Sequence, residues 1–151
     1  MPRTITFDEL KTMAGQEVGV SEWALIDQNR INTFAEATGD HQWIHMDVAR
    51  AAKEMPGGKT IAHGYLTVSL IPMFIGQIMQ IPNVRRIINY GSDKVRFLNA
   101  VRAGSRVRGR QKILKVEPRG GGLQVINQLT IEIEGETKPA CIAETISIVY
   151  A

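Results

Sequence analysis

The sequence predicts an α+β fold, with helices in the first half of the chain and an antiparallel sheet in the second. Three observations support this class. Apolar residues recur at helical spacing behind Asp27, a long apolar segment follows at 64–80, and from about residue 105 apolar and polar residues alternate with a period of two. Consecutive strands joined by short turns pair antiparallel. At 151 residues, the chain is expected to form a single domain over 1–151.

The segment before residue 40 is expected to contain a short helix at 7–14, a short strand at 18–25 and a longer helix. Asp27 starts this longer helix, because its carboxylate can accept from the free amides of the first turn. Gly39 ends it, since glycine adopts the left-handed conformation beyond a helix end without steric penalty. The residues that recur on one face of this helix are Ile31, Phe34, Ala35 and Thr38.

The middle of the chain is predicted to hold a short helix and then one long apolar helix. Asp47 is expected to cap the short helix, which runs to about residue 55 and is stopped by 56–58, Pro-Gly-Gly. Residues 64–80 are apolar almost all round, which is typical of a helix wrapped by other elements. Pro72 predicts a kink, because proline removes one amide donor and crowds the preceding turn.

The second half of the chain is predicted to form consecutive strands. One run alternates clearly at 123–134, and a last strand is expected at 140–150. Loops are expected at 117–122 and 134–139. An earlier run breaks phase at 113–114, which indicates a bulge or the end of that strand. Its alternating residues are basic: Arg106, Arg108, Arg110 and Lys112.

The composition is that of an ordinary globular protein, with 44% hydrophobic and 22% charged residues. A net charge of +3 is compatible with a phosphate-bearing ligand and does not require nucleic acid. Cys141 is the only cysteine, so the sequence predicts no internal disulfide and a reducing compartment, the cytoplasm. The start of the chain lacks the apolar stretch of a signal peptide. Pro72 and Gly76 interrupt the longest apolar run, which favours a buried helix over a membrane span.

A carboxylate and an imidazole lie five residues apart, at Asp40 and His45, in the loop expected after Gly39. A fixed Asp/His pair can hold a water molecule and transfer a proton. This chemistry suits an enzyme that adds water to a carbonyl compound or removes it. Trp43 and Ile44 give the pair apolar neighbours, and such surroundings would shift the pKa values of both Asp40 and His45. The alternative is a loop carboxylate and a surface histidine with structural duties alone.

A second candidate feature is His63-Gly64, at the start of the apolar segment 64–80. The first amides of a helix have no internal partners, and the helix dipole favours negative charge there. Glycine would let a ligand approach these amides, and an enolate oxygen would gain most from them. The alternative is that Gly64 serves only close packing. Ser69, about a turn and a half farther along, is a further candidate for the same cleft.

A metal site at His41 and His45 is a weaker interpretation. The segment has no third histidine at ligand spacing and is expected to be loop, so the sequence predicts neither a metal nor a cofactor. Cys141 lies in an isoleucine-rich strand and is expected to pack rather than react. The basic strand is interpreted as a solvated face rather than a nucleic-acid site. Some residues of this strand could instead hold the phosphates of a carrier. Basic residues elsewhere in the chain could do the same, namely Lys59, Arg85, Arg86, Lys94 and Arg96.

Taken together, these motifs resemble the MaoC-like dehydratases, the (R)-specific enoyl-CoA hydratases of the hot-dog fold, and more narrowly their nodulation protein N branch. The family motif runs from an aromatic residue through Gly-Asp, Asn-Pro, an aliphatic residue and His to a small residue six positions later. It corresponds here to Phe34, Thr38-Gly39-Asp40, Ile44, His45 and Ala51. Gln42-Trp43 replaces the usual Asn-Pro, and Ala62-His63-Gly64 matches the family's helix start. The order of segments also fits, including 90–101.

The resemblance implies a curved antiparallel sheet wrapped around the long helix at 64–80, and a homodimer whose sheets join. It implies reversible hydration of a trans-2-enoyl-CoA to an (R)-3-hydroxyacyl-CoA. Asp40 and His45 would hold the water, and the Gly64 amide, with His63 and Ser69 near it, would bind the thioester oxygen.

Three other functions compete with this one. A hot-dog thioesterase would hydrolyse the same thioester and release free thiol. A non-catalytic acyl-CoA binding domain would bind without turnover. A nucleic-acid binder would show affinity that falls steeply with salt.

Overall fold

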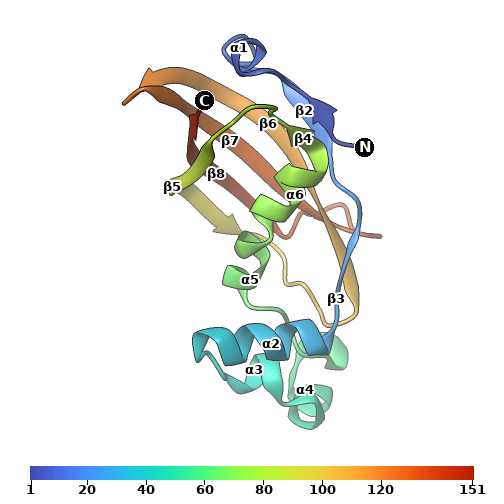
Figure 1. Cartoon of the computed structure of the whole chain (residues 1–151). Helices are drawn as coiled ribbons and strands as arrows, with labels where there is room; N and C mark the ends of the chain where they lie inside the picture. Colours follow the sequence, from blue (N-terminus) through green and yellow to red (C-terminus); the bar gives the residue numbers. More distant parts are fainter.

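The computed structural model describes all 151 residues and confirms the predicted α+β class. A curved six-stranded antiparallel sheet covers two consecutive helices, α5 and α6, that lie across its inner face (Figure 1). Helices α2, α3 and α4 gather beyond one end of the sheet, and α1 lies at the opposite end. The strand order is β2-β6-β7-β8-β5, with β3 also paired to β6.

The elements have the following bounds. The helices are α1 Phe7–Leu10, α2 Gln28–Thr38, α3 Trp43–Met46, α4 Val48–Glu54, the 3₁₀ turn η1 Pro56–Gly58, α5 Gly64–Ser69 and α6 Ile71–Ile78. The strands are β1 Arg3–Thr4, β2 Glu17–Val20, β3 Ala24–Ile26, β4 Met79–Gln80, β5 Arg86–Phe97, β6 Ser105–Arg119, β7 Gly122–Ile133 and β8 Cys141–Tyr150. None of these helices combines the length and hydrophobicity needed to cross a bilayer.

The central helix is shorter than predicted and divided. The segment expected as one helix over 64–80 forms α5 and α6, which meet at Leu70. Pro72 lies in the first turn of α6, where its missing amide donor costs no hydrogen bond, so the break precedes the proline. The helix ends at Ile78 because Met79 pairs with Arg3 in the small parallel β1–β4 sheet.

Close packing fixes α6 on the sheet. Phe74 is fully buried in the main hydrophobic core, between α6 and the strands. Gly109 of β6 lies directly beneath it, and a Cβ added there would lie 2.9 Å from the Phe74 Cβ. The side chain of Phe74 therefore occupies the space that a larger residue at Gly109 would need.

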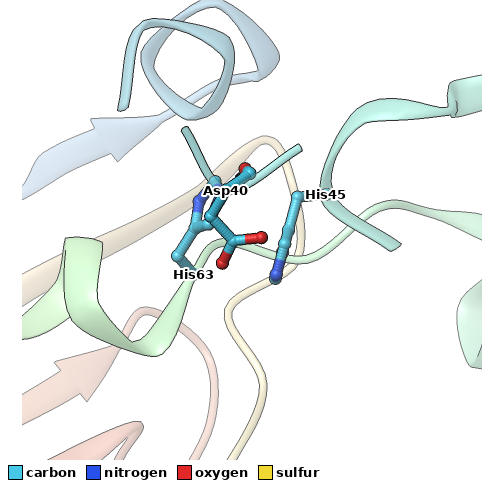
Figure 2. A group of neighbouring side chains, drawn as sticks. All are labelled: Asp40, His45 and His63. Atoms are coloured by element: carbon cyan, nitrogen blue, oxygen red, sulfur yellow. The ribbon is translucent and has the colours of Figure 1, made fainter. Parts of the chain in front are cut away.

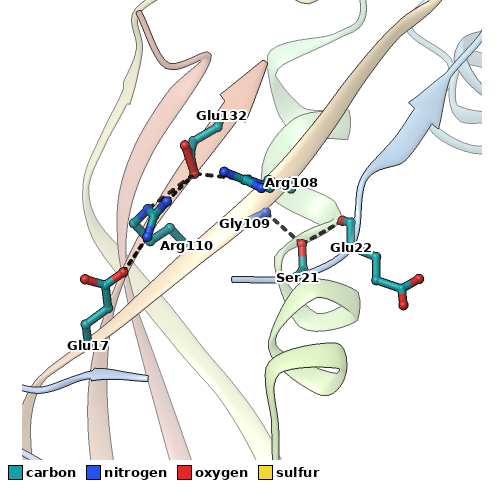
Figure 3. A network of polar contacts seen from close by, with 7 residues as sticks. All are labelled: Glu17, Ser21, Glu22, Arg108, Gly109, Arg110 and Glu132. Atoms are coloured by element: carbon teal, nitrogen blue, oxygen red, sulfur yellow. Dashed lines mark hydrogen bonds and ion pairs between the residues drawn. The ribbon is translucent and has the colours of Figure 1, made fainter. Parts of the chain in front are cut away.

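The strand predicted at 18–25 is two strands, β2 and β3, separated at 21–23. The cause is Ser21, whose hydroxyl accepts from the Gly109 amide at 2.9 Å and donates to the Glu22 carbonyl at 2.9 Å (Figure 3). A side chain thus takes the place of a backbone acceptor in the ladder. The opening helix is also shorter than predicted and ends at Leu10.

Two central basic residues of β6, Arg108 and Arg110, are paired with acids on neighbouring strands. Arg110 contacts Glu17 at 2.6 Å and Glu132 at 3.2 Å, and Arg108 contacts the same Glu132 at 3.3 Å (Figure 3). The charges of Arg108 and Arg110 are therefore balanced at close range.

Strands β6 and β7 follow the predicted alternation, and the isoleucine-rich segment expected as the last strand forms β8. The phase break at 113–114 is a bulge, because the register of β6 against β7 shifts between Ile113 and Lys115. Both strands run farther than expected, so the predicted loop at 117–122 shrinks to a turn at Gly120-Gly121, two glycines with positive φ.

Candidate active site

The carboxylate of Asp40 is positioned by the end of α2. Asp27 caps the start of this helix by accepting from the Arg30 amide at 2.9 Å. Gly39 ends it in the left-handed conformation, with φ of 82°, as predicted. Asp40 follows in the exposed loop, where Oδ1 accepts from the Gln42 amide at 3.3 Å.

His45 lies in the short helix α3 rather than in the predicted loop, and its side chain is buried, with 7% of its surface exposed. Its Nδ1 lies 2.7 Å from the Ile61 carbonyl. Because a carbonyl only accepts, Nδ1 must carry the proton, and in the neutral ring Nε2 is then an acceptor. The Ile61 carbonyl thereby fixes both the orientation and the tautomer of the imidazole.

The backbone of His45 is held from a second direction. The Gln28 side-chain amide donates to the His45 backbone carbonyl at 2.7 Å. The Thr60 hydroxyl donates to Oε1 of the same Gln28 side chain. Thr60 and Gln28 are far apart in the sequence, so this connection fastens α3 to both α2 and the segment before α5. These two hydrogen bonds restrict the position of the His45 backbone, while the Ile61 carbonyl restricts its ring.

The ring of His63 stacks on that of His45, with centroids 3.9 Å apart and planes inclined by 23°. Only 2% of the His63 surface is exposed. Its Nε2 donates to the Asp40 carbonyl at 3.0 Å, while Nδ1 is buried without a partner. His63 thus contacts both members of the predicted pair and links the loop after α2 to the start of α5.

Asp40, His45 and His63 form one cluster, in which one ligand-type atom of each lies within 4.8 Å of the others. The Asp40 carboxylate and the tip of the His45 ring point toward one another (Figure 2). Such a group has the geometry to hold either a water molecule or a metal ion. His41, considered from the sequence as a ligand, is instead paired with Glu36 at 2.8 Å.

The electrostatic environment favours a neutral His45. Burial lowers the pKa of His45 below its ordinary value of 6.5, and the adjacent His63 acts in the same direction. The Ile61 carbonyl and the Asp40 carboxylate oppose this shift and do not reverse it. At neutral pH the ring therefore offers an unprotonated Nε2 toward the carboxylate.

Folding stability should fall as the pH drops below about 6.5, the ordinary value for histidine. The pKa of His45 is lower in the folded chain, so the unfolded chain takes up this proton first. Between the two pKa values the unfolded state binds more protons, and stability must rise with pH. Urea denaturation at several pH values, compared between the wild type and His45→Gln, measures this contribution. A wild-type curve parallel to that of the variant would contradict it.

The start of α5 presents free backbone donors. The amides of Gly64 and Tyr65 have no hydrogen-bond partner within the chain. A cavity of about 320 Å³ opens beside Gly64, and Thr67 and Phe97 contribute to its wall. The Phe97 ring lies 3.0 Å from the position of a Cβ on Gly64, so glycine at this position lets the ring pack closely against the start of α5. Ser69 lies outside this cavity, and its hydroxyl donates back to the Tyr65 carbonyl at 2.6 Å.

Comparison with known proteins places this arrangement in a family. The family model described as "MaoC like domain" matches residues 9–132. The chain belongs to the MaoC-like dehydratase family. The match covers α2, the Asp40/His45/His63 cluster, α5, α6 and most of the sheet.

Relatives in this family are similar over most of their length. The chain is 48% identical to 3-hydroxyacyl-thioester dehydratase Z of Mycobacterium tuberculosis, over 91% of each chain. It is 43% identical to nodulation protein N of Rhizobium leguminosarum bv. viciae, over 96% of this chain and 91% of the relative. The (R)-hydratase of A. caviae involved in PHA biosynthesis superposes with a TM-score of 0.72 at 21% identity, over 89% and 94% of the two chains. These findings confirm the hot-dog fold and support a hydro-lyase.

Several contacts at the site were not predicted from the sequence. The Ile61 carbonyl, Gln28 and Thr60 hold His45, yet no motif marks them. The place of His63 beside the thioester oxygen stays a prediction, and the stacking of its ring on His45 was not foreseen.

Proposed function

We propose that the protein is an (R)-specific enoyl-CoA hydratase, a single MaoC-like domain over 1–151 that reversibly hydrates trans-2-enoyl-CoA to (R)-3-hydroxyacyl-CoA in the cytoplasm. The observation that carries the proposal is the Asp40 carboxylate facing a buried imidazole whose Nδ1 is already committed to the Ile61 carbonyl. The dehydratase relative at 48% identity supports the same reaction class.

One water molecule can donate to both members of the pair. Nε2 of His45 and a carboxylate oxygen of Asp40 are acceptors, so a bound water would direct its two hydrogens to them and a lone pair to Cβ of the enoyl thioester. As the C–O bond forms, one proton passes to the pair, and the pair returns a proton to Cα. Atoms balance as one water added across the double bond, and the coupled pair acts as a single proton carrier.

The negative charge that develops on the thioester oxygen requires donors. The free Gly64 amide at the start of α5 is the candidate, with that of Tyr65 beside it. A preorganised backbone donor of this kind is worth about 3 kcal/mol to the transition state. In this arrangement His63 is a positioning residue, since it holds the Asp40 carbonyl and supports the His45 ring.

The proposal is tested by following crotonyl-CoA consumption at the absorbance of the conjugated enoyl thioester, with a thiol reagent in a parallel reaction. We expect the absorbance to fall without thiol release. Thiol release would instead identify a thioesterase, and binding without turnover would identify an acyl-CoA binding domain. Activity that survives treatment with EDTA is also expected, because the proposed steps need only the pair and backbone amides.

We further propose that two copies join through β5 to form a homodimer. This strand of 12 residues has a partner on one edge only, β8, and a long edge left open invites pairing with another chain. It also exposes large apolar side chains: Ile87, Ile88, Tyr90 and Phe97.

Light scattering should therefore give a mass twice the 16.7 kDa of one chain. Ile87→Lys, which places a charge on the inner side of the open edge, should shift the mass toward the single chain. Val48→Lys, at a similarly exposed position on α4, is the control and should leave it unchanged. A single-chain mass for the wild type would contradict the dimer.

A further inference from the structure

A row of polar side chains crosses the inner face of the sheet, where apolar residues are expected. Gln111 of β6 and Asn127 of β7 interrupt the apolar alternation of their strands. Asn127 is paired in register with Thr145 of β8, and Thr145 with Ser92 of β5. Three adjacent strands thus each contribute a neutral polar residue at the same level, and Gln111, which is paired in register with Leu129, reaches Asn127 diagonally from β6.

Three of these residues are buried, and their polar groups are incompletely satisfied. Gln111, Asn127 and Thr145 expose only 0%, 2% and 8% of their surface. Gln111 donates to the Asn127 side-chain oxygen at 2.8 Å, whereas the Gln111 oxygen and the Thr145 hydroxyl have no partner. Unpaired buried polar atoms are costly and uncommon, so a ligand that satisfies the Thr145 hydroxyl would be favoured.

A cavity of about 330 Å³ opens between this row and α6. One wall is apolar and includes Val68, Ile71 and Ile75 of the central helices, while Asn127 and Thr145 lie in the opposite wall. Other polar residues of the wall are Gln80, Asn89, Ser92 and Ser147, and no charged side chain contributes. The lining therefore suits a mostly apolar chain with a neutral polar group, and disfavours a carboxylate, which would need a cation.

The cavity is lined by residues that follow Gly64 on the same two helices, so an acyl chain that runs along these helices from a thioester at Gly64 would reach it. It begins at Val68 and continues past Ile75, whereas Gly64 opens the same helical segment. At a rise of 1.5 Å per residue, these positions are roughly 6 and 16 Å from Gly64 along the helices. If the thioester lies at Gly64, carbon 9 of an extended acyl chain falls within this range of distances from Gly64.

We propose that this cavity receives the distal part of the acyl chain, and that the physiological substrates are enoyl thioesters carrying a hydroxyl or carbonyl oxygen near the far end of the chain. The inference rests on the proposed hydratase function. Thr145 and Asn127 would hydrogen-bond that oxygen, while α6 packs against the methylenes.

The test compares kcat/KM for trans-2-decenoyl-CoA with that for its 9-hydroxy and 9-oxo derivatives, and uses crotonyl-CoA as a substrate too short to reach the cavity. The wild type should prefer an oxygenated chain by at least about tenfold, because a site built to bind an oxygen discriminates against the analogue that lacks it. Thr145→Val, which removes the hydroxyl and keeps the shape, should abolish most of this preference and leave crotonyl-CoA hydration unchanged. Thr130→Val, on the opposite face of β7, is the matched control.

Equal use of plain and oxygenated chains, or a preference that survives in Thr145→Val, would overturn the inference and leave the hydratase function standing. Failure to hydrate any substrate, crotonyl-CoA included, would instead overturn the proposed function and this inference with it.

Discussion

Asp40→Asn and His45→Gln should each lower kcat for enoyl-CoA hydration by about 10² to 10⁴, the range for loss of a positioned acid or base. Asparagine directs a donor as well as an acceptor toward the water and cannot carry its proton. Glutamine can still donate to the Ile61 carbonyl, yet it offers no basic nitrogen where Nε2 stands. Each variant removes one member of a coupled pair, so the kcat of the double variant should be little lower than that of either single variant.

Two variants outside the Asp40/His45/His63 cluster are the matched controls. His41→Gln changes a histidine four residues earlier whose exposed ring is paired with Glu36 outside the cluster. Asp8→Asn changes an exposed carboxylate in α1. Both should keep wild-type kcat, and far-ultraviolet circular dichroism should show that all four variants are folded. Wild-type turnover in Asp40→Asn or in His45→Gln would remove the pair from the mechanism.

Phe74→Ala should lower the free energy of unfolding by about 3 to 5 kcal/mol, the usual cost of deleting a fully buried phenylalanine. Phe74 is 0% exposed and packs from α6 onto β6 at Gly109. The loss leaves a cavity between helix and sheet, because the backbone beneath has no side chain that could fill it. Chemical denaturation measures the effect.

The neighbouring Met73→Ala is the control for Phe74→Ala. Met73 lies on the outer side of α6 with 37% of its surface exposed. Its truncation should lower the free energy of unfolding by well under half of the loss in Phe74→Ala. A second arm tests the contact itself: Gly109→Ala should destabilise the wild type and do so less in the Phe74→Ala background, which removes the ring atoms Cδ2 and Cγ at 3.0 and 3.1 Å and keeps only the Phe74 Cβ. Additive effects of the two changes would mean that Phe74 and Gly109 do not share the space described above.

The parts of the fold predicted well from the sequence are those with local signals. Asp27 and Gly39 indicate both ends of α2, alternation indicates β6 and β7, and an isoleucine-rich run indicates β8. Strand β5 carries no such alternation, because as an edge strand with two register shifts it is exposed along most of its length. Only the family resemblance pointed to a segment there.

The break between α5 and α6 shows a second limit. The apolar pattern continues through Leu70, so periodicity gives no indication of the break. Pro72 was recognised as a disturbance, yet whether it kinks a helix or starts a new one depends on the packing of the turn before it. Tertiary contacts decide between these outcomes.

The candidate site shows the same division. Asp40, His45 and Gly64 were identified from residue types and spacing, and the structure brings the first two together. The group that fixes the His45 tautomer is a backbone carbonyl, which every residue has, so no sequence pattern could single out Ile61. Likewise, the stacking of His63 on His45 depends on how the loop after α2 meets the start of α5.

The most direct test of the central claim runs the reaction in the dehydration direction. The wild-type protein is incubated separately with (R)- and (S)-3-hydroxybutyryl-CoA while the absorbance of the conjugated enoyl thioester is followed. We predict that this absorbance rises with the (R) compound alone, and that it does not rise in Asp40→Asn. A rise with the (S) compound, or no rise with either while the circular dichroism shows a folded protein, would contradict the account.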